Sequence, residues 1–178
     1  MPSGWQLEAL KSQSVAARTY GVRAIVSGGT HDICDTTSCQ VYGGVAAETA
    51  NTNKAIDGTK GKILMYQGKP AFTQFSSSSG GWTNKGSQPY LKPVRDDWDN
   101  FSSNTVHNWS ITVKASTIEK KHASIGKLEK ITITKRNGYG YDGGRVNSVT
   151  LKGSKGSKTI TGVNARWDFG MRSDWFGF

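Results

Sequence analysis

The sequence predicts an α+β fold in which a long, alanine-rich N-terminal helix packs on mixed or antiparallel strands and the C-terminal half is rich in strands. Residues 8–20, EALKSQSVAARTY, have the composition of a helix with recurring alanine. After Asn108, short apolar runs alternate with glycine-rich turns, which is typical of strands. The 178 residues suit one domain over 1–178, with a strand-rich subdomain over 106–178 as a candidate subdivision.

Helix signals dominate the first third of the chain, and a hairpin signal follows them. The expected elements are a helix from Trp5 to Ile25 or Val26 with Ser3 as its N-cap and Gly28–Gly29 as its end, a cysteine loop over 30–42, a weaker helix over 46–56 that ends near Gly58, and strands over 62–66 and 71–75 joined by residues 67–70.

The second half alternates short strands with short helices. The expected elements are a strand over 109–113, a short helix opened by a capping box of Ser116 and Glu119, strands over 128–135, 145–151 and 158–161, a helix over 163–169, and a tail whose Trp175 and Phe176 pack on the core.

Glu8, in the first turn of the first helix, is a candidate general acid. Cleavage of a glycosidic bond needs a protonated carboxyl aimed at the leaving oxygen. The residues alone favour the commoner alternative, a surface carboxylate paired with Lys11 or Ser12. Both roles stay open at the level of composition and spacing.

Three further side chains of this helix are candidate site residues. Gln13 lies one turn from alanines on either side, so we expect its amide on a packed face, where it needs hydrogen-bond partners. Arg18 and Tyr20 are candidates for lining a site. The alternative for them is pairing with internal carboxylates such as Glu48 or Asp57.

Two cysteines, Cys34 and Cys39, lie in the loop after the first helix. Together with His31 they place three zinc-binding side chains within nine residues, whereas a closed structural zinc site uses four ligands. The spacing also suits a short disulfide in a secreted protein, which we favour over an open zinc site and over free thiols. Apart from that alternative structural zinc, no cofactor is expected.

A run of small residues directly follows the predicted hairpin and precedes Trp82. A flexible linker and a contact surface for sugar or phosphate are the two interpretations. The chain has no G-x-S-x-G elbow and three histidines, so a serine-nucleophile triad is not expected. The candidate binding residues of the run are Ser76, Ser77, Ser78, Gly80 and Gly81.

The net charge of +10 favours polyanionic partners over neutral ones, with an ordinary basic surface as the alternative. No nucleic-acid motif accompanies the charge and the aromatic residues form no stacking series, so nucleic acid is not expected as a partner. No apolar stretch reaches transmembrane length and no signal peptide is visible. Because Met1 leads almost directly into the helix, we expect the true N-terminus to lie upstream.

Five segments, in one order, are distributed along nearly the whole chain, from residue 1 to residue 176. They are MPSGWQLEALKSQSVAARTY (1–20), DICDTTSCQVYGG (32–44), AIDGTKGKILMYQGKPAFTQFSSSSGGWT (55–83), PYLKPVRDDWD (89–99) and ITGVNARWDFGMRSDWF (160–176). Together they resemble the motifs of the stage II sporulation protein D family, also called the amidase-enhancer family.

This resemblance implies a lytic transglycosylase that cleaves peptidoglycan strands stripped of their stem peptides. One glutamate, here Glu8, would protonate the glycosidic oxygen, and the muramic 6-hydroxyl would attack the anomeric carbon to leave a 1,6-anhydro end. Gln13 and Arg18 would orient the acid or the substrate, and residues 76–81 would line the cleft. The alternative is a non-catalytic enhancer of a wall amidase.

The resemblance also implies partners and a location. Glycan strands of peptidoglycan are the expected partner, with a cell-wall amidase and anionic wall polymers as further candidates. The expected location is extracellular or in the cell envelope, by secretion or by anchoring through a segment upstream of Met1.

Overall fold

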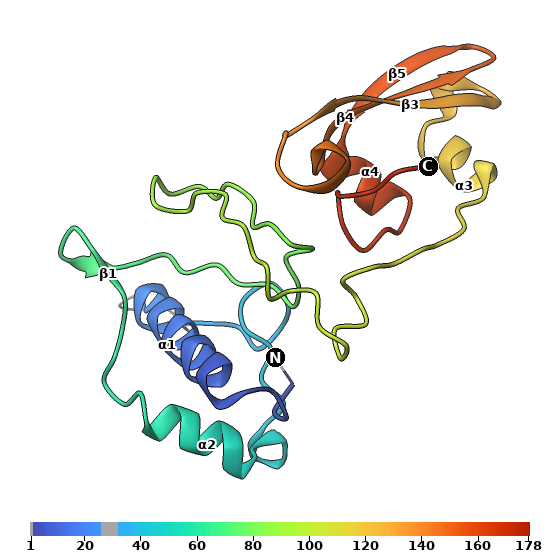
Figure 1. Cartoon of the computed structure of the whole chain (residues 1–178). Helices are drawn as coiled ribbons and strands as arrows, with labels where there is room; N and C mark the ends of the chain where they lie inside the picture. Colours follow the sequence, from blue (N-terminus) through green and yellow to red (C-terminus); the bar gives the residue numbers. More distant parts are fainter. Residues whose placement is uncertain (1, 26–31) are drawn as a thin grey trace. The chain divides into compact units, whose positions relative to one another are not determined.

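The computed structural model describes residues 2–25 and 32–178, so Val26, the Gly28–Gly29 stop signal and His31 lie outside the described residues. The chain divides into two compact units, Met1–Ser77 and Ser78–Phe178, each described by itself below (Figure 1). The predicted α+β class is confirmed, with a helical start and a strand-rich C-terminal part. The single domain over 1–178 and the subdomain over 106–178 stay predictions.

The first unit is built mainly from two helices that pack together, with a small hairpin beside the first of them. Its elements are α1 (Leu7–Ala24), the 3-10 turn η1 (Val45–Ala47), α2 (Ala50–Asp57), β1 (Met65–Tyr66) and β2 (Lys69–Pro70).

Alanines allow other parts of the unit to reach the backbone of α1. The carbonyl oxygen of Ala16 accepts a hydrogen bond from Thr73 Oγ1 at 2.7 Å, and that of Ala17 accepts one from Gln40 Nε2 at 2.8 Å. A bulky side chain at either position would crowd such an approach to the helix. The alanine-rich composition therefore serves close packing against polar partners.

The start of α1 differs from the prediction. The helix is flanked by Gln6, which makes no side-chain cap, so Ser3 as N-cap is wrong. The reason is a turn before the helix, in which Trp5 N–H donates to Pro2 O at 3.2 Å. That turn places Ser3 too far upstream to reach the free N–H groups of the first helical turn.

The second helix is shorter than predicted, and the hairpin is tighter. Thr49 caps α2 through a reciprocal capping box with Thr52, so the residues before it form the separate turn η1. Gly58 follows the last residue of α2, as predicted. In the hairpin, Gln67 and Gly68 take positive φ values of 48° and 75°, which makes a two-residue turn and brings β2 directly after it.

The second unit contains an antiparallel three-stranded sheet of order β3-β4-β5. Its elements are α3 (Ala115–Lys121), η2 (Ala123–Ile125), β3 (Leu128–Arg136), η3 (Tyr141–Gly143), β4 (Val146–Gly153), β5 (Gly156–Thr161) and α4 (Gly162–Asp168). The three predicted strands and the two predicted helices of this region are confirmed, with ends shifted by one to two residues.

One face of this sheet carries the core of the second unit. Val149 and Leu151 on β4 are fully buried and pack with Ala165 of α4. Each buried aliphatic side chain of this size stabilises the fold by about 1.5–3 kcal/mol. Phe176 of the C-terminal tail joins the same cluster, which confirms its predicted packing.

Two local predictions in this unit are wrong. Residues 109–113 form no strand, although Trp109 and Val113 do pack on the core as partly buried side chains. The capping box is also absent, because α3 is flanked by Lys114 and Glu119 Oε1 instead accepts a hydrogen bond from Leu128 N–H at 2.8 Å. Among residues 2–25 and 32–178, no helix is long and apolar enough to span a membrane.

Candidate functional site

The predicted acid, Glu8, lies on the surface of α1. Its side chain is 81% exposed, and Oε1 forms an ion pair with Lys11 Nζ at 2.7 Å. Ser12 Oγ donates to the backbone carbonyl of Glu8 at 3.0 Å. These contacts match the alternative given in the sequence analysis, a surface carboxylate paired with Lys11 or Ser12. An exposed ion pair of this kind contributes about 0.2–1 kcal/mol to stability.

A groove of about 430 Å³ begins at Glu8. One wall comes from α1 and the other from the segment that follows α2, and the lining combines hydroxyls, two lysines and aliphatic side chains. The lining residues are Glu8, Lys11, Ser12, Val15, Gly58, Thr59, Lys62 and Leu64. Glu8 is the carboxylate among them, so this groove is the place in the first unit where Glu8 could meet a ligand.

Arg18 holds the second wall of this groove against α1. Its Nη1 donates to Thr59 O at 2.6 Å and to Lys62 O at 3.0 Å, and its Nη2 donates to Ile56 O at 3.3 Å. The guanidinium thus satisfies carbonyl groups at the end of α2 and in the turn after it. Arg18 thus donates to backbone carbonyls in these bonds, and not to the carboxylates of Glu48 or Asp57 that the sequence analysis gave as alternative partners.

Tyr20 and Gln13 occupy other surroundings on the same helix. The Tyr20 ring lies 5.9 Å from Phe72 and 6.4 Å from Phe75, centroid to centroid, so it belongs to an aromatic cluster at the C-terminal part of α1. Gln13 is half-buried on α1. Their roles in substrate binding stay predictions.

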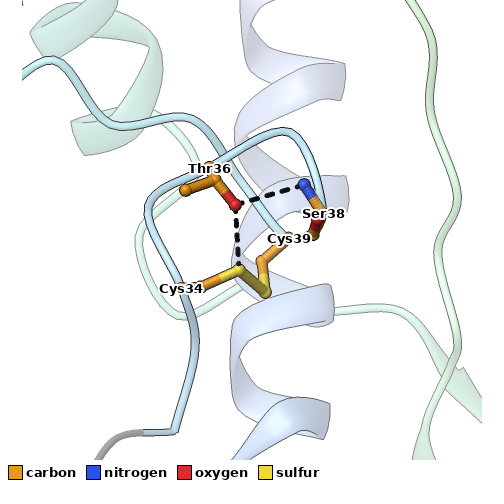
Figure 2. The surroundings of a disulfide bond; sticks show 4 residues. All are labelled: Cys34, Thr36, Ser38 and Cys39. Carbon is orange, nitrogen blue, oxygen red and sulfur yellow. Dashed lines mark hydrogen bonds between the residues drawn. A yellow bond between two sulfur atoms is a disulfide. The ribbon is translucent and has the colours of Figure 1, made fainter.

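Cys34 and Cys39 form a disulfide in the loop that precedes η1 (Figure 2). Thr36 Oγ1 lies between the two ends of this short loop, 3.4 Å from Cys34 Sγ and 3.4 Å from Ser38 N. A thiolate is the zinc-binding form of cysteine, so neither sulfur serves as a zinc ligand in this state. His31, the third residue of the zinc alternative, lies outside the described residues.

The serine-glycine run crosses the boundary between the two units. Ser76 and Ser77 are exposed at the end of the first unit, whereas the segment from Ser78 on belongs to the second. In the second unit this segment pairs with a later one, since Thr83 N–H donates to Val94 O at 2.9 Å and Asp96 N–H donates to Gly81 O at 2.9 Å.

A buried carboxylate, Asp99, organises the loop. Its side chain is 6% exposed and accepts hydrogen bonds from Ser78 Oγ at 2.8 Å, Ser79 N–H at 2.7 Å and Gly80 N–H at 3.0 Å. His107 Nδ1 lies 2.5 Å from Asp99 Oδ2. Four donors therefore converge on one carboxyl group.

These contacts set the charge of Asp99. Burial by itself raises the pKa of its carboxyl, but the hydrogen bonds from His107, Ser79 and Ser78 lower it further than burial raises it, so the pKa lies below the ordinary 3.8. Asp99 is therefore ionised at neutral pH. The ionised Asp99 carboxylate accepts a hydrogen bond from the Nδ1–H of His107.

The arrangement is not that of a serine nucleophile with its base. Ser78 Oγ donates to Asp99 rather than to His107, and it also accepts a hydrogen bond from Asn104 Nδ2 at 3.2 Å. Its hydroxyl is therefore used to hold the loop. Of the predicted loop residues, Ser78 and Gly80 contact Asp99 directly, and a Cβ at Gly81 would lie 3.9 Å from His107 Cε1.

Arg145, at the start of β4, fixes the other end of this loop. Its Nη2 donates to Ser79 O at 2.7 Å and to Trp82 O at 3.3 Å, while its Nη1 pairs with Asp174 Oδ1 at 2.6 Å. The guanidinium also lies over the Trp175 ring at 5.6 Å. The loop is thus held from both sides by buried or half-buried charges.

Sequence reasoning missed Asp99, His107 and Arg145. The available signal was the acidic cluster RDDWD in a chain of strongly positive net charge, placed shortly after a loop rich in N–H and hydroxyl donors. That signal does not say which of Asp96, Asp97 and Asp99 turns inward. Asp97 is 58% exposed and pairs with Arg95, so the three carboxylates differ only in tertiary context.

Comparison with known proteins gives one family match. Residues 1–66 match the family model described as SpoIID, stage II sporulation protein. These residues contain α1, the cysteine loop, α2 and the groove beside Glu8.

Curated relatives extend the similarity to nearly the whole chain. The amidase enhancer of Bacillus subtilis (strain 168) is 40% identical over 71% of this chain and 17% of its own length. Stage II sporulation protein D of the same organism is 31% identical, and that of Bacillus amyloliquefaciens is 29% identical, each over 97% of this chain and 55% of the relative. The chain thus spans about half or less of the length of these relatives.

Proposed function

Because the chain belongs to the stage II sporulation protein D (SpoIID) family of cell-wall-related sporulation and amidase-enhancer proteins, we propose that it is a lytic transglycosylase acting on peptidoglycan strands stripped of stem peptides. The observation that carries the proposal is the groove of the first unit, which combines one carboxylate with hydroxyls and lysines inside the segment that matches the family. The proposed setting is the cell envelope.

In this reaction, the carboxyl of Glu8 gives its proton to the glycosidic oxygen as the bond from the anomeric carbon breaks. The 6-hydroxyl of the same muramic residue attacks the anomeric carbon, and its proton returns to the Glu8 carboxylate. The products are a free 4-hydroxyl on one fragment and a 1,6-anhydro end on the other. One carboxyl group serves both steps, so the mechanism needs no second carboxylate.

Because of its surroundings, Glu8 could act as an acid only if the bound substrate favours the protonated form of its carboxyl. Glu8 is exposed and paired with Lys11, whereas a general acid must carry a proton when it acts. A glycan strand covering the groove would exclude water there, and exclusion of water favours the protonated form of a carboxyl. Arg18 would act as a positioning residue, because it holds the wall formed by Thr59 and Lys62.

The test is mass spectrometry of the products released from purified, peptide-stripped glycan. The wild-type chain should release fragments with 1,6-anhydro ends, and Glu8→Gln should release none above background. Glu48→Gln, which changes an exposed glutamate of the same unit, is the matched control and should behave as wild type. Product release by Glu8→Gln at the wild-type rate would remove Glu8 from the mechanism.

One observation favours a second candidate function, a non-catalytic enhancer of a wall amidase. The exposure and ion pair of Glu8 are those of an ordinary surface carboxylate, and one relative is itself named amidase enhancer. This function predicts retention on wall glycan, no soluble sugar product, and faster release of stem peptides when the chain is added to a wall amidase. Anionic wall polymer would assist retention through the net charge of +10.

A further inference from the structure

The long connection between β3 and β4 displays two tyrosines. Residues 137–145 read NGYGYDGGR, and the side chains of Tyr139 and Tyr141 are 41% and 82% exposed. Four glycines of this connection and Asp142 have positive φ values, so the backbone takes a conformation that most side chains would strain. The loop therefore has a defined, locally costly shape with aromatic rings at its surface.

The loop lies directly on two tryptophans. A Cβ at Gly140 would come within 2.7 Å of Trp82 Cδ1 and closer still to Trp175 Cη2, so only glycine allows this approach. The Trp82 and Tyr139 rings lie 5.4 Å apart, and Trp175 Nε1 donates to Tyr141 O at 3.1 Å. We call Trp82, Tyr139, Tyr141 and Trp175 the aromatic surface.

The aromatic surface is continuous with the serine-glycine loop. Trp82 directly follows that loop in the chain, and a Cβ at Gly80 would meet Trp175 Cε3 at 3.3 Å. Arg145 links the two regions, because it lies over Trp175 while it donates to Ser79 O and Trp82 O. Polar groups and aromatic faces thus meet at one place in the second unit.

We propose that the aromatic surface is a saccharide-binding subsite at which a pyranose ring of a glycan strand stacks on Tyr141 and Tyr139. A pyranose ring has an apolar face of C–H bonds and an edge of hydroxyls, so it suits aromatic rings that border hydrogen-bonding groups. Tyrosine supplies both features, with a flat ring and a terminal hydroxyl. Partly buried Trp82 lies against the Tyr139 ring, and partly buried Trp175 holds the backbone of Tyr141 through its indole N–H.

This inference rests on the proposed function for the identity of the polymer, and it adds a binding site outside the Glu8 groove. An exposed apolar patch that is rimmed by polar groups is typical of an interaction site, whereas a single exposed aromatic side chain is not. The second unit holds such side chains elsewhere too, including Trp167 on α4, which is 68% exposed. Trp167 therefore provides a matched comparison for the effect of removing any exposed aromatic ring.

The experiment titrates the 178-residue chain against insoluble, peptide-stripped glycan and measures how much of the chain is retained. Tyr141→Ala should weaken retention roughly three- to tenfold, and Tyr139→Ala should weaken it by a similar or smaller factor. Tyr141→Phe keeps the ring and should retain most of the affinity. Trp167→Ala should bind within twofold of wild type. Thermal unfolding of each variant verifies that the fold is kept.

Each outcome decides something. Wild-type retention by Tyr141→Ala, or an equal loss in Trp167→Ala, overturns the subsite. Retention reports binding and soluble anhydro product reports cleavage, so the two proposals fail separately. A chain that binds glycan through Tyr141 but releases no product overturns the transglycosylase and leaves the subsite standing. A wild-type chain with no retention on glycan overturns the subsite, while the product assay decides the transglycosylase.

Discussion

The two units of this protein each present a carboxylate beside a sequence motif, and the two carboxylates could hardly differ more. Glu8 is 81% exposed and has one ion pair on a helix surface, whereas Asp99 is 6% exposed and receives four hydrogen-bond donors. The first is open to contact by a ligand. The second is fixed as an anion that shapes a loop. The difference teaches that a motif locates a carboxylate, while burial and donors decide its task.

The largest effect should come from removing Glu8, the proposed general acid. Glu8→Gln should lower the rate of anhydro-product release by about a hundredfold or more, since loss of a general acid costs a factor of about 10²–10⁴. The free energy of unfolding should change by less than about 1 kcal/mol, because the lost pair with Lys11 is exposed. Product analysis checks the rate and denaturant unfolding checks the free energy of unfolding, both on one preparation of the variant.

The opposite result is expected for the buried carboxylate. Asp99→Asn should lower the free energy of unfolding of the second unit by about 3 kcal/mol, because an amide cannot accept all four donors and leaves buried groups unpaired. Five of the six tryptophans lie in this unit, so tryptophan fluorescence during denaturation follows it. Asp97→Asn is the control and should cost little, since Asp97 is exposed.

The buried carboxylate Asp99 should also make the stability of the second unit depend on pH in the acid range. The pKa of Asp99 is lowered in the folded protein, so its contribution to stability is fully present above the ordinary value of 3.8 and is lost as pH falls through the lower folded value. Wild-type stability of the second unit should therefore decline from about pH 3.8 downward, more steeply than in Asp99→Asn. Equal slopes would show that Asp99 does not hold its charge in the way the contacts indicate.

A smaller effect is expected at Arg18, which links the groove wall to α1. Arg18→Met keeps the aliphatic stem but removes the donors to Thr59, Ile56 and Lys62, and should destabilise the first unit by about 2 kcal/mol. Circular dichroism at 222 nm during denaturation follows this helical unit. Lys54→Met on α2 is the control for loss of a positive charge. If Arg18→Met were as stable as the control, the guanidinium would not be holding this wall.

The smallest effect should come from the disulfide of the first unit. It closes a short loop, since Cys34 and Cys39 are five positions apart, so its removal in a Cys34→Ser, Cys39→Ser variant should cost about 2 kcal/mol or less. The second unit should keep its stability. A metal assay on reduced and oxidised protein checks the zinc alternative: zinc bound by the reduced form alone would give the two thiols a second role.

Local chemistry made much of the fold predictable. Patterns within a few residues predict the helix α1, the end of α2 near Gly58, the three strands of the sheet and the helix α4. The predictions that failed were local patterns that a contact with a distant residue overrides, or that lack the distant partner they need. Glu119 looks like half of a capping box, but Leu128 N–H takes its carboxylate, and residues 109–113 alternate like a strand without a neighbouring strand to pair with.

The candidate site was predictable only in part. The sequence pointed to Glu8, Arg18 and the serine-glycine loop. For Arg18 it left open a role in lining a site or pairing with a carboxylate, and the structure shows hydrogen bonds to backbone carbonyls. It also missed Asp99 and the aromatic surface. In each case the deciding contact joins residues far apart in the chain, such as Arg145 and Ser79, which are 66 positions apart.

The sequence by itself determined the α+β class, the helix that carries Glu8 and the family to which the chain belongs, because helical periodicity, glycine punctuation and ordered motifs are local properties of the chain. Only the tertiary structure decided that Glu8 is exposed while Asp99 is buried, and that Trp82 lies against the Tyr139 ring while Trp175 donates to Tyr141 O. Burial and hydrogen bonding depend on which distant segments meet, and no local pattern of residues encodes that meeting.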